Sequence, residues 1–304
     1  MASRILHVIG WLIWILAAAS VFAAPALAWG PGAHIECSTF LLKNLILLAP
    51  AMRRLLRHNP FAFIYGSVCP DMVLGKRLMS AEKNNHNWNV GFKLLGSAAS
   101  KREEAFAMGY LTHLAADTVA HNLFIPDQLL HRFDRRRRGH VTLELLFDSM
   151  LDDDIWTMAR TVARKPFPDC EALLHRALPR APLPKRVNKR LFRSGALMVR
   201  TGQWQKIIRE LRDHWDHELN SLNLASYIQA VHNTVIEFLN DTSSAPCLQQ
   251  SPMGRPVLAR AETLKKTMKR LKRDDCLGPE RYSTLVSDFR LWRVKVLSPQ
   301  PAAS

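Results

Sequence analysis

The sequence predicts an all-α protein, and three features support this fold class. Apolar residues recur every three or four positions through most of the chain. Ser, Asn and Pro stand where these runs begin or end. No segment alternates polar and apolar residues over a useful length, as a half-buried strand would. We therefore expect about eight helices in a single domain, because residues 29–304 can form one large core and no Gly- or Ser-rich linker divides them.

Residues 1–28 have the features of an export signal. Arg4 precedes an apolar run from Ile5 to Phe22, and Ala26-Leu27-Ala28 fits the small-x-small cleavage pattern. We expect cleavage after Ala28 and export of a periplasmic or extracellular protein that begins at Trp29. An uncleaved signal would instead leave a membrane anchor, since the apolar run is nearly long enough to span a bilayer.

The first half of the domain is expected to contain broken helices. Ile35–His58 reads as a helix that is interrupted near Pro50 and ended by Asn59-Pro60. Gly66 and Pro70 then predict a bend, which would present Asp71 at the end of an element. The polar and aromatic segment Glu82–Val90 reads as a loop.

A long helix is expected to follow. Ser100 and Glu103 form a capping box that begins it, and it runs to about Phe124, with Pro126 closing it. The loop Asp127–Gly139 carries four consecutive arginines, and a second helix opens with His140.

The C-terminal part reads as an irregular connection followed by helices. Five prolines at positions 166–184 indicate a connection around a short helix. The further helices are expected at about Lys185–Val199, Trp204–Asn220, Ala225–Asn240, Val257–Lys272 and Pro279–Val294. We expect residues 29–165 to carry the functional site and residues 166–304 to form a helical extension whose role the sequence does not indicate.

The net charge limits the classes of binding partner, and the cysteine count limits the possible disulfides. The formal net charge is +16, or +15 after removal of Arg4, and this favours anionic lipid or nucleic acid without choosing between them. Basic runs such as Arg135–Arg138 and Lys265–Arg273 can equally be solvated faces. The five cysteines are scattered, so at most two disulfides are possible and their pairing cannot be deduced. No feature indicates a protein partner.

The most informative pattern lies within the long helix. His113, Asp117 and His121 recur every four residues in an apolar, alanine-rich segment, so all three side chains share one helix face. His140 and Glu144 repeat the spacing on the next helix. Imidazoles and carboxylates at this spacing are typical zinc ligands. The alternative is that each is a hydrogen-bonded core or surface residue. A rival pair, His214 and His217, is better explained as part of an exposed amphipathic helix.

With these residues placed in order, the segment Trp29–Glu144 resembles the zinc-dependent phospholipase C family. The resemblance implies an α-helical fold with two or three zinc ions, one of them bound by the amine and carbonyl of the N-terminal tryptophan. It also implies a set of zinc ligands: Trp29, His34, Asp71, His86, His113, Asp117, His121, His140 and Glu144.

The resemblance further divides these ligands among three ions, with Asp117 bridging two of them. The first ion takes Asp71, His86, His113 and Asp117; the second takes His121, His140 and Glu144; the third takes Trp29, His34 and Asp117.

Two spacings depart from the family's pattern. Only three residues separate Asp117 from His121, where phospholipases have more. The short step from Trp29 to His34 is similar to that of the related zinc nucleases and 3′-nucleotidases. Glu144, however, follows the phospholipase pattern.

The expected activity is zinc-dependent hydrolysis of a phosphodiester. The resemblance implies a phospholipase C that acts on phospholipid at a membrane surface and releases diacylglycerol and a phosphorylated headgroup, with Asp71 orienting or deprotonating the attacking water. A zinc nuclease or 3′-nucleotidase is the alternative enzyme. A non-catalytic protein that binds metal or a membrane surface is the alternative from another class. Asp148 is expected either to steady His140 or its neighbour or to lie on exposed helix surface.

Overall fold

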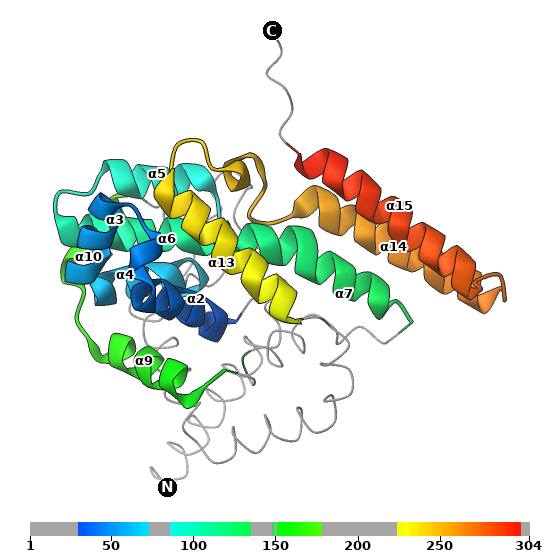
Figure 1. The fold of residues 1–304 in the computed structure, drawn as a ribbon, viewed down its shortest axis with the longest axis horizontal. Coiled ribbons are helices and arrows are strands. Elements are labelled where there is room, and N and C mark those ends of the chain that lie inside the picture. The colour runs from blue at the N-terminus through cyan, green and yellow to red at the C-terminus, as the bar shows by residue number, and fades with distance from the viewer. Residues whose placement is uncertain (1–29, 73–85, 135–147, 149–150, 178–223, 299–304) are drawn as a thin grey trace, which may run out of the picture.

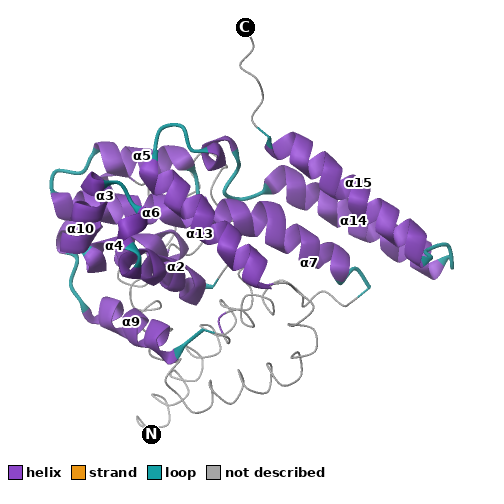
Figure 2. Ribbon diagram, in the orientation of Figure 1, coloured by secondary structure: helices purple, strands orange, loops and turns teal. Residues whose placement is uncertain are grey.

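The computed structural model describes residues 30–72, 86–134, 148, 151–177 and 224–298, and these form helices without any strand (Figures 1 and 2). The all-α prediction is therefore confirmed. The export signal at 1–28 and the helices expected at 185–199 and 204–220 lie outside the described residues. Among the residues that are described, no helix is long and apolar enough to cross a membrane.

Helix α6 (Lys101–Val119) forms the centre of the core. Sixteen of its 19 residues are buried. Its largest contacts with other helices are with α4 (Pro60–Val68), α5 (Trp88–Gly96) and α13 (Leu224–Asn240). A polar side chain on so buried a helix must find partners inside the protein, because burial without them costs several kcal/mol, on the order of 2–7.

The start of α6 agrees with the expected capping box in one of its two bonds. The Ser100 hydroxyl accepts a hydrogen bond from the Glu103 amide at 3.2 Å. The Glu103 carboxylate bonds the amide of Ala99, at 2.6 Å, rather than that of Ser100. Both contacts satisfy amides that the first helical turn cannot pair.

Gly66 lies inside α4, so the bend predicted there is wrong. A Cβ atom on Gly66 would collide with the Phe106 carbonyl of α6, and one on Gly109 would collide with the Phe63 carbonyl of α4. The two glycines therefore let the backbones of α4 and α6 touch. Asp71 follows in the 3₁₀ turn η2 (Cys69–Met72), at the end of an element as expected.

Pro126 does not close the long helix, and this prediction is also wrong. The π-helical turn η5 (Ala120–Phe124) follows α6 directly and leads into α7 (Ile125–His131). Pro126 lies in the first turn of α7, where a missing N–H is tolerated. Consequently Asp127 belongs to a helix and not to the expected loop.

The remaining N-terminal elements mostly follow the prediction. The broken helix consists of α2 (Pro31–Lys43), η1 (Leu45–Leu47) and α3 (Pro50–His58). The loop expected over 82–90 ends earlier, because α5 begins at Trp88. Helix α9 (Asp153–Arg164) was not predicted, while α10 (Pro168–Ala177) is the short helix expected among the prolines.

Helices near the C-terminus match the prediction within a few residues. Helix α13 packs on α6 and belongs to the main core. After η7 (Pro246–Gln249), α14 (Arg255–Arg273) and α15 (Pro279–Leu297) form a hairpin that projects from the body in Figure 1 and shares a second, small core with α7. All five cysteines, including the four that are buried, are free thiols.

Candidate metal centre

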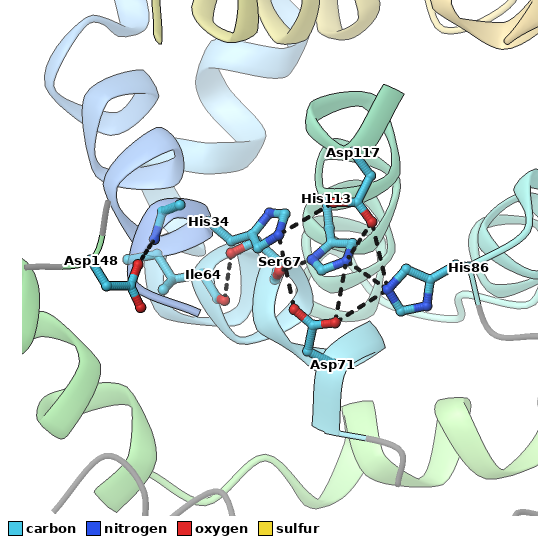
Figure 3. A network of polar contacts seen from close by, with 9 residues as sticks. His34, Ile64, Ser67, Asp71, His86, His113, Asp117 and Asp148 are labelled. Atoms are coloured by element: carbon cyan, nitrogen blue, oxygen red, sulfur yellow. Dashed lines mark hydrogen bonds and ion pairs between the residues drawn. The ribbon is translucent and has the colours of Figure 1, made fainter. Parts of the chain in front are cut away.

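Five of the predicted ligands converge in one buried cluster (Figure 3). They come from four places in the fold: His34 lies in α2, Asp71 in η2, His86 just before α5, and His113 with Asp117 in α6. Each side chain is at most 9% exposed. Residues separated by more than eighty positions in the sequence thus form one site.

Three ligand atoms, from His86, His113 and Asp117, lie at distances that suit one zinc ion, and Asp71 lies next to them. The His86 Nε2 atom is 3.1 Å from His113 Nε2 and 3.2 Å from the nearer oxygen of Asp71. The Asp117 Oδ2 atom is 3.3 Å from His113 Nε2 and 3.6 Å from His86 Nε2, and Asp71 Oδ1 is 3.9 Å from His113 Nε2. Zinc–ligand bonds of 2.0–2.1 Å in tetrahedral geometry place ligand atoms about 3.3 Å apart. The atoms of His86, His113 and Asp117 therefore fit around a common centre, while Asp71 belongs to a second group with His34 and His113.

His34 faces the other oxygens of the same two carboxylates. Its Nε2 atom lies 3.5 Å from Asp117 Oδ1 and 3.9 Å from Asp71 Oδ2. That nitrogen is buried and has no hydrogen-bond partner among the described residues. His34 and Asp71 therefore belong, with His113, to a second group of candidate ligand atoms beside the first, and this group would hold a neighbouring ion.

A backbone carbonyl orients His113. Its Nδ1 atom donates a hydrogen bond to the Ser67 carbonyl of α4 at 2.7 Å, which leaves the Nε2 lone pair for the cluster. Its ring also stacks on His34, with ring centroids 3.7 Å apart. The sequence did not indicate Ser67, because any residue type can supply a carbonyl. The close approach of α4 and α6 at Gly66 and Gly109 explains the position of this carbonyl.

Electrostatics gives the cluster the protonation states of metal ligands. Burial and the neighbouring His113 lower the pKa of His34 to about 3, against the opposing attraction of Asp117 and Asp71, so His34 is a neutral imidazole at neutral pH. Burial acts to raise the pKa of Asp117, but attraction by the neighbouring histidines, His113 first and then His121 and His34, holds it below its usual value. Asp117 is therefore an ionised carboxylate.

Asp148 is buried and contacts the start of α2 rather than solvent. Its Oδ1 atom accepts a hydrogen bond from the Ala33 amide at 3.2 Å, and the Gly32 amide also bonds its carboxylate. A Cβ on Gly30 or Gly32 would collide with this carboxylate. The alternative of an exposed surface position is therefore wrong, and the described contacts tie Asp148 to the segment before His34; a contact with His140 stays a prediction, because His140 lies outside the described residues. Burial raises the pKa of Asp148 to about 7, although the two backbone hydrogen bonds oppose the shift.

His121 is buried but lies outside the two ligand groups that the described residues form. It sits in the π turn η5, and its Nδ1 atom has no hydrogen-bond partner within the described part of the chain. Its expected co-ligands His140 and Glu144, the N-terminal Trp29 and the rival pair His214 and His217 fall outside the described residues.

The fold and the cluster together define a helical protein with a buried imidazole–carboxylate centre suited to zinc. The family model described as zinc dependent phospholipase C matches residues 33–237, and the chain belongs to this family. No curated protein and no solved structure gives a significant match. The family match reaches well beyond Glu144 and includes residues 166–237, and the residues after 237 lie beyond it. Family membership supports a zinc-dependent hydrolase of the phospholipase C type.

Proposed function

We propose that this chain is an exported zinc-dependent phosphodiesterase that cleaves phospholipid into diacylglycerol and a phosphorylated headgroup. The observation that carries the proposal is the set of three ligand atoms 3.1–3.6 Å apart that His86, His113 and Asp117 form, with Asp71 Oδ1 3.2 Å from His86 Nε2. Such a set inside a family of zinc-dependent phospholipases is best explained as the catalytic metal centre.

The proposed ligands extend beyond this set. Asp71 and Asp117 would bridge towards His34, where the Trp29 amine and carbonyl complete the neighbouring position. His121, His140 and Glu144 would hold a further ion. The support for the second group is the family resemblance together with the buried, unbonded Nδ1 atom of His121.

The residues around the ions have distinct tasks in the proposed reaction. Bound zinc would lower the pKa of a water and offset charge on the phosphate. Asp71 is the more exposed of the two carboxylates, 9% against 3% for Asp117, so it is the one that reaches arriving substrate. We assign Asp71 to orient or deprotonate the attacking water, which then displaces the diacylglycerol oxygen in line. His113 and Asp117 are fully enclosed and serve to hold metal.

The test is an assay of the purified chain beginning at Trp29 with phosphatidylcholine and with anionic phospholipid. Diacylglycerol release that a chelator abolishes is the expected result. Asp71→Asn should lose at least about 100-fold in turnover, as expected when a positioned general base is lost. Asp288→Asn, the same change at an exposed position of α15, should not change it. Full hydrolysis and folding in Asp71→Ala would favour a non-catalytic binding protein, and metal-free protein of full activity would refute the proposal.

A zinc nuclease or 3′-nucleotidase is the second candidate, favoured by the short step from Trp29 to His34 and by the net charge of +16. Zinc-dependent hydrolysis of single-stranded nucleic acid without any lipid turnover would select it. The same protein preparations serve both assays.

Export with cleavage before Trp29 is part of the proposal. If the Trp29 amine is a zinc ligand, a variant that retains one extra residue before Trp29 should lose one zinc ion and most activity. N-terminal sequencing of exported protein, combined with its zinc content, tests cleavage and ligation together. Unchanged zinc content in the extended variant would exclude the N-terminal ligand.

A further inference from the structure

The short segment Gln250–Gly254 links the family domain to the C-terminal hairpin. It lies after the family match, which ends at residue 237, and directly before α14. Each of its described polar contacts with the domain falls beside a candidate metal ligand.

On one side the segment contacts the π turn η5. The Asn122 side-chain nitrogen donates hydrogen bonds to the Ser251 carbonyl at 3.0 Å and to the Thr118 carbonyl at 2.8 Å. Gly254 has a positive φ of 54° and lies so close to His121 that a Cβ on it would collide with the His121 carbonyl oxygen. Only glycine combines this backbone conformation with this close approach at low cost.

On the other side the segment contacts the beginning of α5. The Trp88 indole N–H donates a hydrogen bond to the Gln250 carbonyl at 2.9 Å. Trp88 follows His86 by two residues, and its ring also packs near Phe238 of α13. Thus one five-residue segment bonds next to both His86 and His121.

The hairpin supports the π turn at a third point. Arg293 of α15 is buried, and its guanidinium donates a hydrogen bond to the Leu123 carbonyl at 3.3 Å and pairs with Asp127 at 2.9 Å. The turn that carries His121 is therefore held by contacts from residues 251, 254 and 293, all of which lie beyond the family match.

A π turn needs such support more than an α turn does. It fits an extra residue into the turn, it is rare, and it occurs mostly as a single turn at functional sites. Its geometry sets a direction for the His121 side chain that a regular α-helix would not give. Because only three residues separate Asp117 from His121, the direction of the His121 side chain determines whether it reaches a metal ion.

We propose that Gln250–Gly254 is a positioning element of the metal centre, which fixes His121 through the π turn and His86 through Trp88. This inference rests on the proposed function, in which both histidines bind zinc. It gives the C-terminal extension a role that the sequence alone did not indicate: removal of its contacts should weaken metal binding without removing any ligand.

Gly254→Ala tests the inference, with Gly278→Ala as its matched control. Gly278 precedes α15 in the same extension, and nothing lies within 4 Å of the place where its Cβ would be. Zinc content after equilibrium dialysis, the visible spectrum of bound Co²⁺ and the thermal stability of metal-free protein are measured for both. Gly254→Ala should bind at least one ion about 10-fold or more weakly and show an altered Co²⁺ spectrum, as supporting residues typically do. Gly278→Ala should match the wild type.

Trp88→Phe provides a second test that keeps an aromatic ring at this position while removing the indole N–H that bonds Gln250. Trp88→Phe should also weaken zinc binding, but less than Gly254→Ala does. If Gly254→Ala does not fold, the result for Trp88→Phe decides whether Gln250–Gly254 positions the site. Wild-type zinc affinity and spectrum in folded Gly254→Ala, or in Trp88→Phe when the first variant fails to fold, would overturn the positioning role. Wild-type protein that binds no zinc would refute the proposed function itself, and unchanged zinc content in His121→Ala would refute the assignment of His121.

Discussion

The contact between α4 and α6 makes Gly109→Ala a sharp test of how the fold positions the site. The new Cβ would collide with the Phe63 carbonyl and lie 3.0 Å from the Ser67 amide. The two helices must therefore separate by on the order of 1 Å, a strain that costs about 1–3 kcal/mol. Better helix propensity of alanine offsets about 1 kcal/mol of this cost. We expect a net loss of up to about 2 kcal/mol in the free energy of unfolding.

The larger effect should be on metal binding. The Ser67 carbonyl belongs to the displaced backbone, so its 2.7 Å bond to His113 lengthens and the imidazole loses its fixed orientation. Loss of such a partner typically weakens metal binding about 10–100-fold. Zinc affinity by competition with a chromophoric chelator, with denaturant unfolding of metal-free protein, measures both effects. Gly96→Ala is the control, because no atom lies within 4 Å of its would-be Cβ. Wild-type zinc affinity in Gly109→Ala would refute the reasoning.

Three further predictions address the charged groups. Asp117→Asn should reduce zinc affinity by about 100-fold or more, since it removes a charge close to both ligand groups; undiminished zinc content after dialysis would contradict this. In metal-free protein, the folded state keeps a proton on Asp148 up to about pH 7, whereas the unfolded chain loses it near pH 4, so stability falls as pH rises through this window. In Asp148→Asn the side chain still accepts hydrogen bonds but carries no charge. Its stability relative to the wild type should therefore increase across this window, by at most about 4 kcal/mol. Thermal scans from pH 4 to pH 8 that show a constant stability difference between the two proteins would contradict this prediction. Arg293→Met should destabilise by about 3 kcal/mol because it leaves Asp127 buried without its closest cation, while Arg290→Met at an exposed position should cost less than about 1 kcal/mol; equal unfolding midpoints would contradict this.

Part of the site was predictable because metal chemistry restricts residue types. His113 and Asp117 were identified from their spacing on one helix face, which a local rule is sufficient to predict. Their partners His34, Asp71 and His86 came from the family resemblance, since nothing in their local sequence links them to α6. The structure brings these three together with the pair on α6, and it gives Asp71 the same two-sided geometry as Asp117.

Errors in the predicted elements arose where contacts distant in the sequence decide the conformation. Gly66 is read locally as a helix breaker, but it lies in a helix because α6 fills the space of its missing side chain. Pro126 is read as a stop, yet the preceding π turn lets the chain continue into α7. Both errors fall next to the candidate site, where close packing matters most.

The sequence by itself determined the all-α class, the main helix boundaries and the chemical identity of the candidate ligands. These follow from the period of apolar residues, from capping residues and from the ligand preferences of zinc, all of which are local properties. Only the tertiary structure decided which ligand atoms lie about 3.3 Å apart, which carbonyl orients His113 and where Asp148 finds its hydrogen bonds. These features depend on how separate segments of the chain approach one another, and any residue type can provide a backbone amide or carbonyl, so the sequence does not reveal them.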